Sequence, residues 1–120
     1  LVQRGADFNL QNSEGFTALM LAALDGHERV VDLLVQRGAD IDLQSSDGVT
    51  ALMGAAGWNR LAAVQRLLRA GADTTLRGEN GKTALMLAKD NGHTECARAI
   101  EEHAGKRKKG TGTNTEGALA

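Results

Sequence analysis

The chain has 120 residues, a net charge of −1 at pH 7 and a hydrophobic content of 42%, which are ordinary values for a soluble domain or a short repeat array. It contains no apolar run of roughly 18 residues, so we expect no membrane span. The single cysteine, Cys96, cannot form an intrachain disulfide, and no signal-peptide pattern points to secretion. We therefore expect an intracellular protein located in the cytoplasm, with the nucleus as the alternative.

The sequence repeats itself with a fixed period. Gly-Ala-Asp begins at Gly5, Gly38 and Gly71, and Thr-Ala-Leu-Met begins at Thr17, Thr50 and Thr83, always 33 residues apart. A unit this short cannot enclose a core, so each copy must bury its apolar face against its neighbours. Because residues 1–7 are identical to residues 34–40, we expect the chain to be cut from a longer array. The predicted divisions are a remnant of a preceding repeat at 1–4, repeats at 5–37, 38–70 and 71–103, and a disordered Gly-Thr-rich tail at 104–120.

Each unit is expected to contain two helices joined by a tight turn. The threonines at positions 17, 50 and 83 suit helix N-caps, since a hydroxyl oxygen can accept an otherwise unpaired backbone N–H. First helices are predicted at 18–25, 51–57 and 84–91, and second helices at 28–36, 61–69 and 94–102. Between them lie Gly26, Asn59 and Gly92, residue types that tolerate positive φ, and Gly38 and Gly71 are expected to end the second helices.

Apolar residues spaced three and four apart predict one buried face on every helix. In the first helices these are Leu19, Leu21, Ala22, Leu52, Ala55, Ala56, Leu85, Leu87 and Ala88. In the second helices they are Val30, Val31, Leu34, Ala63, Val64 and Leu67. The segments between units have polar tips closed by a glycine, so we expect them to project as hairpin-like loops.

The repeated unit resembles the ankyrin repeat. The resemblance is carried by Gly-x-Thr-Ala-Leu-Met-x-Ala, a Gly-His turn, a Val-Val-x-Leu-Leu helix and Gly-Ala-Asp, and it covers residues 1 to about 103. It implies an all-α solenoid of helix-turn-helix units joined by projecting β-turn loops. The sequence departs from the family where Ala18, Ala51 and Ala84 replace Pro and where Met20, Met53 and Met86 replace His. Glu101, which stands where Val35 and Leu68 stand, suggests that the third repeat is a solvent-facing cap.

The resemblance also implies non-catalytic protein–protein recognition by loop tips and a concave helix face. Among the positions carried over, Gln11 and Gln44 are loop residues expected to face a partner. The predicted partner-binding residues are Glu14, Phe16, Leu24, Asp25, Asp47, Val49, Trp58, Lys82 and Asn91. Their apolar members would form a strip flanked by carboxylates, favouring a partner protein of mixed but mainly basic character. Two alternatives stay open: Trp58 could pack over Gly57, and the whole segment could be a structural spacer or cap of a larger ankyrin-containing scaffold or enzyme.

Nothing in the sequence indicates other chemistry. His27 and His93 hold equivalent repeat positions, and Cys96 aligns with Val30 and Ala63, so we expect no metal site and a buried thiol. Phosphate-binding, nucleophile-elbow and zinc-protease motifs are missing, and we therefore expect no catalytic residue, cofactor or small-molecule substrate. The acidic repeats also make nucleic-acid binding an unfavoured function. The basic run Lys106, Arg107, Lys108 and Lys109 could be a nuclear-import signal or only a solvated linker.

Overall fold

Short helices alternate with extended loops over residues 8–105, the part of the chain that the computed structural model describes. The first helices of the units are α2 (Ala18–Leu24), α4 (Ala51–Gly57) and α6 (Ala84–Asp90). The second helices are α3 (Glu28–Gln36) and α5 (Leu61–Arg69), followed by a helix that includes residues 94–105. Because residues 8–105 contain no strand, the predicted all-α class is confirmed.

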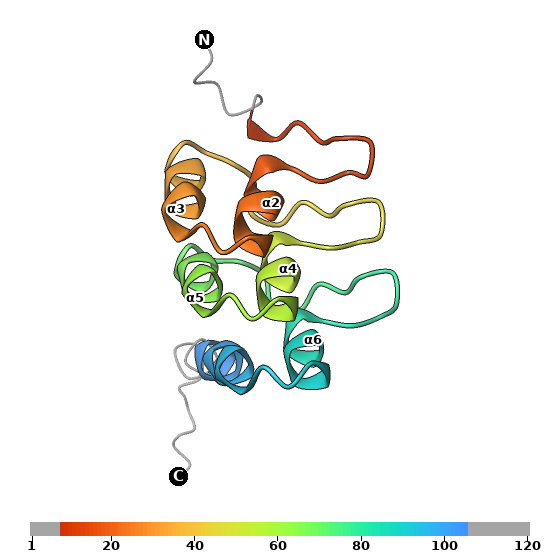
Figure 1. The fold of residues 1–120 in the computed structure, drawn as a ribbon, viewed down its shortest axis with the longest axis vertical. Helices are drawn as coiled ribbons and strands as arrows, with labels where there is room; N and C mark the ends of the chain where they lie inside the picture. The colour runs from red at the N-terminus through yellow and green to blue at the C-terminus, as the bar shows by residue number, and fades with distance from the viewer. Residues whose placement is uncertain (1–7, 106–120) are drawn as a thin grey trace, which may run out of the picture.

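The helices form two parallel layers. Figure 1 shows α2, α4 and α6 stacked in one layer, the other helices in a second, and three long loops projecting from the first layer. Helix α4 packs against both α2 and α6, while α3 packs against α5. This arrangement confirms the prediction that successive units lean on one another instead of closing into a single globule.

The threonine N-caps are confirmed and explain where the first helices begin. Each hydroxyl oxygen accepts a hydrogen bond from the backbone N–H three residues later. The pairs are Met20 to Thr17 at 3.2 Å, Met53 to Thr50 at 3.1 Å and Met86 to Thr83 at 3.3 Å. An N-terminal N–H that would otherwise lack a partner is thereby satisfied in every unit.

The turns between helices adopt the expected left-handed conformation. The φ angles are 77° at Gly26, 60° at Asn59 and 75° at Gly92. Asn59 therefore adopts the conformation that glycine has in the other two units. The second helices of the first two units are followed by Gly38 and Gly71, with φ of 95° and 96°. The left-handed backbone at these positions ends each helix, and glycine adopts it without the strain that a side chain would cause.

The predicted ends of three helices need correction. Helices α2 and α6 each end one residue earlier than predicted, and the last helix continues through residue 105 instead of ending at 102. Its extension follows from Ala104, which occupies the position of the helix-ending Gly38 and Gly71 and continues a helix readily. Residues 104 and 105 therefore do not belong to a disordered tail. The predicted remnant at 1–4 and the basic run at 106–109 lie outside the described residues.

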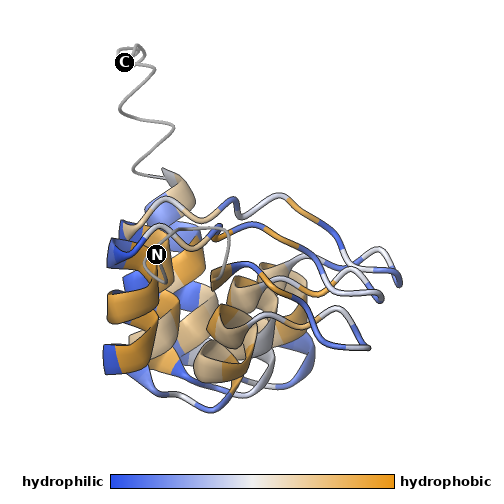
Figure 2. Ribbon diagram, turned by 90° about the horizontal axis from the view of Figure 1, so that it is seen from above, coloured by the Kyte–Doolittle hydropathy of each residue, from blue (hydrophilic) through white to orange (hydrophobic). Residues whose placement is uncertain are grey.

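Hydrophobic residues concentrate in the helices and hydrophilic residues at the loop tips (Figure 2). Most of the predicted interior residues are buried. Two predictions were wrong, because Leu21 and Val30 are 40% and 43% exposed. At the position of Val30, the second and third units have the buried residues Ala63 and Cys96, and the Cys96 thiol contacts Asn59 of the preceding unit. Val30 thus lies on the face of the first unit that, in later units, meets a preceding neighbour.

The methionines show the same dependence on neighbours. Met20 and Met53 are 3% and 2% exposed, whereas the equivalent Met86 is 39% exposed. A further unit packs beyond each of the first two, but the third is the last described. Leu85 is likewise only partly buried, although Leu19 and Leu52 at its position are core residues. The burial of a residue in this fold is therefore set by the adjacent unit as well as by its own helix.

Side-chain amides hold the projecting loops in register. Gln11 donates to the carbonyl oxygen of Gln44 at 3.1 Å, and Gln44 donates to that of Arg77 at 3.0 Å. Backbone bonds add to these: the N–H of Ser46 donates to the Glu14 oxygen at 3.0 Å, and that of Glu79 to the Asp47 oxygen at 2.8 Å. Gln11 and Gln44, expected to face a partner, are thus already engaged within the protein.

The glycines of two loops allow a direct test of this loop packing. Gly48 and Gly81 both have φ of 80°, but a Cβ at Gly48 would lie 2.9 Å from the Glu79 nitrogen, whereas one at Gly81 would have no neighbour within 4 Å. Substitution by alanine costs about 1–2 kcal/mol at either site through the left-handed backbone. Only Gly48→Ala also displaces the next loop and its hydrogen bond, so it should cost about 1 kcal/mol more.

Urea unfolding of both variants, followed by circular dichroism, measures this difference. Gly81→Ala is the matched control for the backbone cost alone. Equal losses of unfolding free energy in the two variants would contradict close packing between the loops.

Candidate functional site

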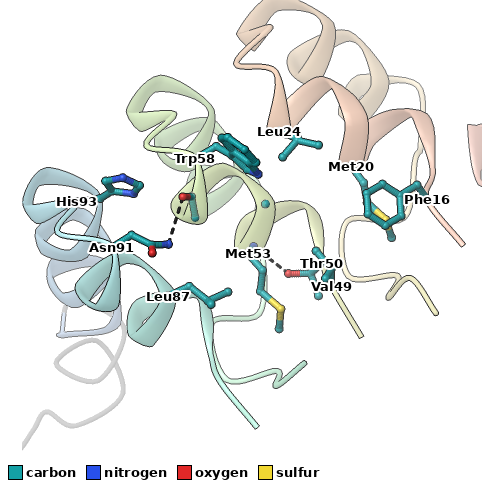
Figure 3. A pocket seen from close by; sticks show the side chains of 12 residues that line it. Phe16, Met20, Leu24, Val49, Thr50, Met53, Trp58, Leu87, Asn91 and His93 are labelled. Atoms are coloured by element: carbon teal, nitrogen blue, oxygen red, sulfur yellow. Dashed lines mark hydrogen bonds between the residues drawn. The ribbon is translucent and has the colours of Figure 1, made fainter. Parts of the chain in front are cut away.

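A groove of about 700 Å³ runs along the first helices of the units (Figure 3). Its apolar side chains belong to Phe16, Met20, Leu24, Val49, Met53, Trp58 and Leu87. Polar side chains are few and come from Thr50, Asn91 and His93, while Gly54 and Gly57 contribute only backbone. A mainly apolar concavity with a small number of polar groups is the usual form of a binding site.

The groove brings together five of the nine predicted partner-binding residues: Phe16, Leu24, Val49, Trp58 and Asn91. The predicted apolar residues thus share one surface. The other four residues, Glu14, Asp25, Asp47 and Lys82, do not line the groove, and the first three of them are exposed.

Trp58 has the most exposed large side chain of the groove. It is 63% exposed, and Figure 3 shows its indole on the side of α4 that faces Leu24. The larger part of the Trp58 surface is therefore open to solvent. A tryptophan left this open to solvent is available for contact with another molecule.

Some of the charged and polar residues near the groove have partners within the protein, and others do not. Lys82 forms an ion pair with Asp90, and Asn91 donates to the carbonyl oxygen of Gly57 at 3.4 Å. Within residues 8–105, the carboxylates of Glu14, Asp25 and Asp47 take part in no ion pair. Three carboxylates near the groove are therefore free of ion pairs, and Arg60, at the turn end of the groove, is a cation without an ion pair among the described residues.

Two polar side chains connect neighbouring units at the turn end of the groove. Arg60 donates through Nε to the Leu24 carbonyl oxygen at 3.0 Å, and the equivalent His93 has Nδ1 2.9 Å from the Ala56 oxygen. Because a carbonyl oxygen only accepts, Nδ1 of His93 carries the hydrogen in this contact. Both side chains satisfy carbonyls at the C-terminal end of the preceding first helix. His93 therefore connects two units and also lines the groove.

Several lining residues were not recognised from the sequence as part of a site. Met20 and Met53 were assigned to the core, and they are buried, yet they also form the floor of the groove. Gly54 was also missed, whereas Gly57 was among the positions that the family resemblance places toward a partner. The sequence indicates that Gly54 is unusual, since Gly54 and Gly57 are two glycines within a seven-residue helix and oppose helix formation. The first unit has Leu21 and Leu24 at their positions.

The sulfur and histidine groups do not gather into a metal site, since residues 8–105 contain no cluster of three or more potential ligands. Cys96 is fully buried, as predicted, and its thiol donates to the Asn59 side-chain oxygen at 3.6 Å. Burial raises the pKa of this thiol, and the nearby carboxylate of Glu95 raises it further. Over the same residues, no helix has the length and apolar character needed to cross a bilayer.

The raised pKa of Cys96 predicts a loss of stability at alkaline pH. The folded state retains the thiol proton to a higher pH than the unfolded state does. The resulting contribution to the free energy of unfolding is therefore fully present below the ordinary pKa of 9.0 and is lost as pH rises above it. Cys96→Ala, which copies the equivalent residue Ala63, removes this contribution. Urea unfolding between about pH 8 and pH 10 should show a steeper decline for the wild type, by at most about 1.4 kcal/mol per pH unit, and equal slopes would refute the assignment.

Comparisons with known families agree with the repeat geometry. A family model described as ankyrin repeats (3 copies) matches residues 1–78, and one described as ankyrin repeat matches residues 80–105. No match is found among curated proteins. Ankyrin repeats are in general protein–protein interaction modules and typically have no catalytic activity.

Proposed function

We propose that this chain, which belongs to the ankyrin-repeat family, is a non-catalytic module that binds a partner protein in the groove along α2, α4 and α6. The observation that carries the proposal is the exposed indole of Trp58 beside an open, mainly apolar groove. Aromatic side chains in such settings often dominate binding, and truncating one can cost about 2 kcal/mol or more.

The rigidity of the surface supports this function. The loop next to each first helix is tied to the following loop by the amides of Gln11 and Gln44 and by backbone bonds. Because these contacts exist before any partner arrives, little conformational entropy is lost on binding. Phe16 and Val49 lie where these loops join the helices, so their positions are fixed as well.

The charges suggest the character of the partner. Glu14, Asp25 and Asp47 lie on the loops and turns beside the groove, and they favour a mainly basic surface through electrostatic complementarity. Lys82 contributes less than the sequence suggests, because Asp90 already neutralises it.

A spacer role in a larger scaffold or enzyme is the second candidate function. It is favoured by the exposed apolar side chains of Leu21, Val30 and Met86, which lie on the outer faces of the first and last described units and could stack against further repeats. An intracellular location and nuclear import through Lys106, Arg107, Lys108 and Lys109 stay predictions from the sequence.

Comparing the proteins captured by the wild type and by a Phe16→Ala/Trp58→Ala double variant distinguishes the two functions. For the binding module we expect the double variant to lose specific partners, with affinity at least about tenfold weaker. Quantitative mass spectrometry of captured proteins measures this loss. Leu10→Ala is the control, since Leu10 is an exposed apolar residue outside the groove.

An unchanged set of partners in the double variant would support the spacer function instead. Thermal unfolding of each variant, followed by circular dichroism, verifies that the helices remain folded.

A further inference from the structure

We propose that a notch at Gly54 and Gly57 receives one large apolar side chain from a basic peptide segment of the partner. This inference rests on the proposed function and specifies the chemistry of the ligand. It begins from the two glycines, which occupy two of the seven positions of α4.

The helix itself does not require glycine at either position. Glycine is less favourable than alanine within a helix, and neither residue has the positive φ that would demand it. The other units carry side chains there: Leu21 and Leu87 correspond to Gly54, and Leu24 and Asp90 correspond to Gly57. The central unit is therefore the one in which the helix surface is lowered.

The two glycines have different surroundings. A Cβ at Gly54 would lie 3.7 Å from the Cβ of Leu24, an ordinary contact, so the neighbouring unit already covers this position in part. A Cβ at Gly57, its chain neighbours apart, would meet no heavy atom within 4 Å. Both glycines line the groove, and the space above Gly57 is open.

The walls of the notch are mainly apolar, and the polar group beside Gly57 is the Asn91 amide, which donates to the Gly57 carbonyl oxygen. Trp58 and Leu24 lie on one side and Leu87 on the other, with Met53 below (Figure 3). A leucine, methionine or phenylalanine side chain placed there would remove apolar surface on both molecules from water. The methionine thioether can adjust to the shape of the inserted group.

Charge complementarity identifies the residues on either side of the inserted one. The exposed carboxylates of Glu14, Asp25 and Asp47 have no ion-pair partner within the described residues. Of the nearby cations, Lys82 is paired with Asp90, and Arg60 adds one positive charge at the turn end of the groove. Asp25 follows Leu24 at the notch, whereas Glu14 and Asp47 belong to the projecting loops. A segment with Lys or Arg along its length on either side of the large apolar residue would meet these carboxylates. An acidic segment would be repelled.

A random peptide library displayed on phage and selected against the 120-residue chain tests the ligand class. We expect the enriched peptides to share a large apolar residue flanked by Lys or Arg. The most enriched peptide is then synthesised with a fluorophore, and its affinity is measured by fluorescence anisotropy.

Gly57→Leu tests whether the apolar side chain of the peptide inserts at the notch, because a leucine fills the notch and also favours the helix. We expect it to weaken binding of the peptide at least about tenfold without lowering the thermal midpoint. Gln65→Leu, which adds the same side chain to an exposed site on α5 outside the groove, should bind as the wild type does. Replacing the apolar residue of the peptide by alanine should weaken binding to the wild type and have little further effect on Gly57→Leu.

Unchanged affinity of Gly57→Leu would overturn the proposal, as would enrichment of acidic peptides or of none. A self-association detected by sedimentation and abolished by Gly57→Leu would identify a second copy of the chain as the occupant and also overturn it. Gly57→Leu could still capture the wild-type set of proteins while the Phe16→Ala/Trp58→Ala variant does not. In that case the proposal that the notch receives a side chain is wrong, and the proposed binding function stands. Should Gly57→Leu fail to fold, Gly57→Ala and the alanine-substituted peptide provide the same comparison with smaller side chains.

Discussion

The burial of each unit against the next is the constraint on which this structure depends. Seven- and nine-residue helices cannot enclose a core alone, and the two layers are stable because α4 contacts both α2 and α6. The methionines record this dependence, since the same residue at the same position is buried at Met53 and exposed at Met86. The groove exists for the same reason: it is formed by first helices from successive units, and no single unit could make it.

Polar contacts between units fix the position of one unit relative to the next, which apolar packing alone does not do. Arg60 and His93 bind carbonyl oxygens of the preceding helix, and Gln44 connects its own loop to the next. Carbonyls at helix ends are costly to leave unpaired, so these bonds restrict how far one unit can slide over another. Apolar contacts alone tolerate small shifts, because they have little directionality.

The periodic features of the fold were predictable from the sequence, and the features that depend on a neighbouring unit were not. Threonine caps, Asn59 in a left-handed turn and the stacked leucines follow from local chemistry repeated in each copy. The exposure of Val30 does not follow from local chemistry, because its counterparts Ala63 and Cys96 are buried by a preceding unit. In the groove, Phe16 and Trp58 were identified because the copies differ at their positions. Met20 and Met53 were not identified as groove residues, because the copies have the same residue there and this indicated only core packing.

The amide bonds between loops have a consequence for how such a protein can change over time. Gln11 and Gln44 maintain the spacing of the units, and neither side chain lines the groove. The two amides that preserve the spacing of the loops are thus separate from the groove residues that would select a ligand. A lineage could exchange Trp58 or fill the gap at Gly57, and so acquire a new specificity, while inheriting an unchanged scaffold.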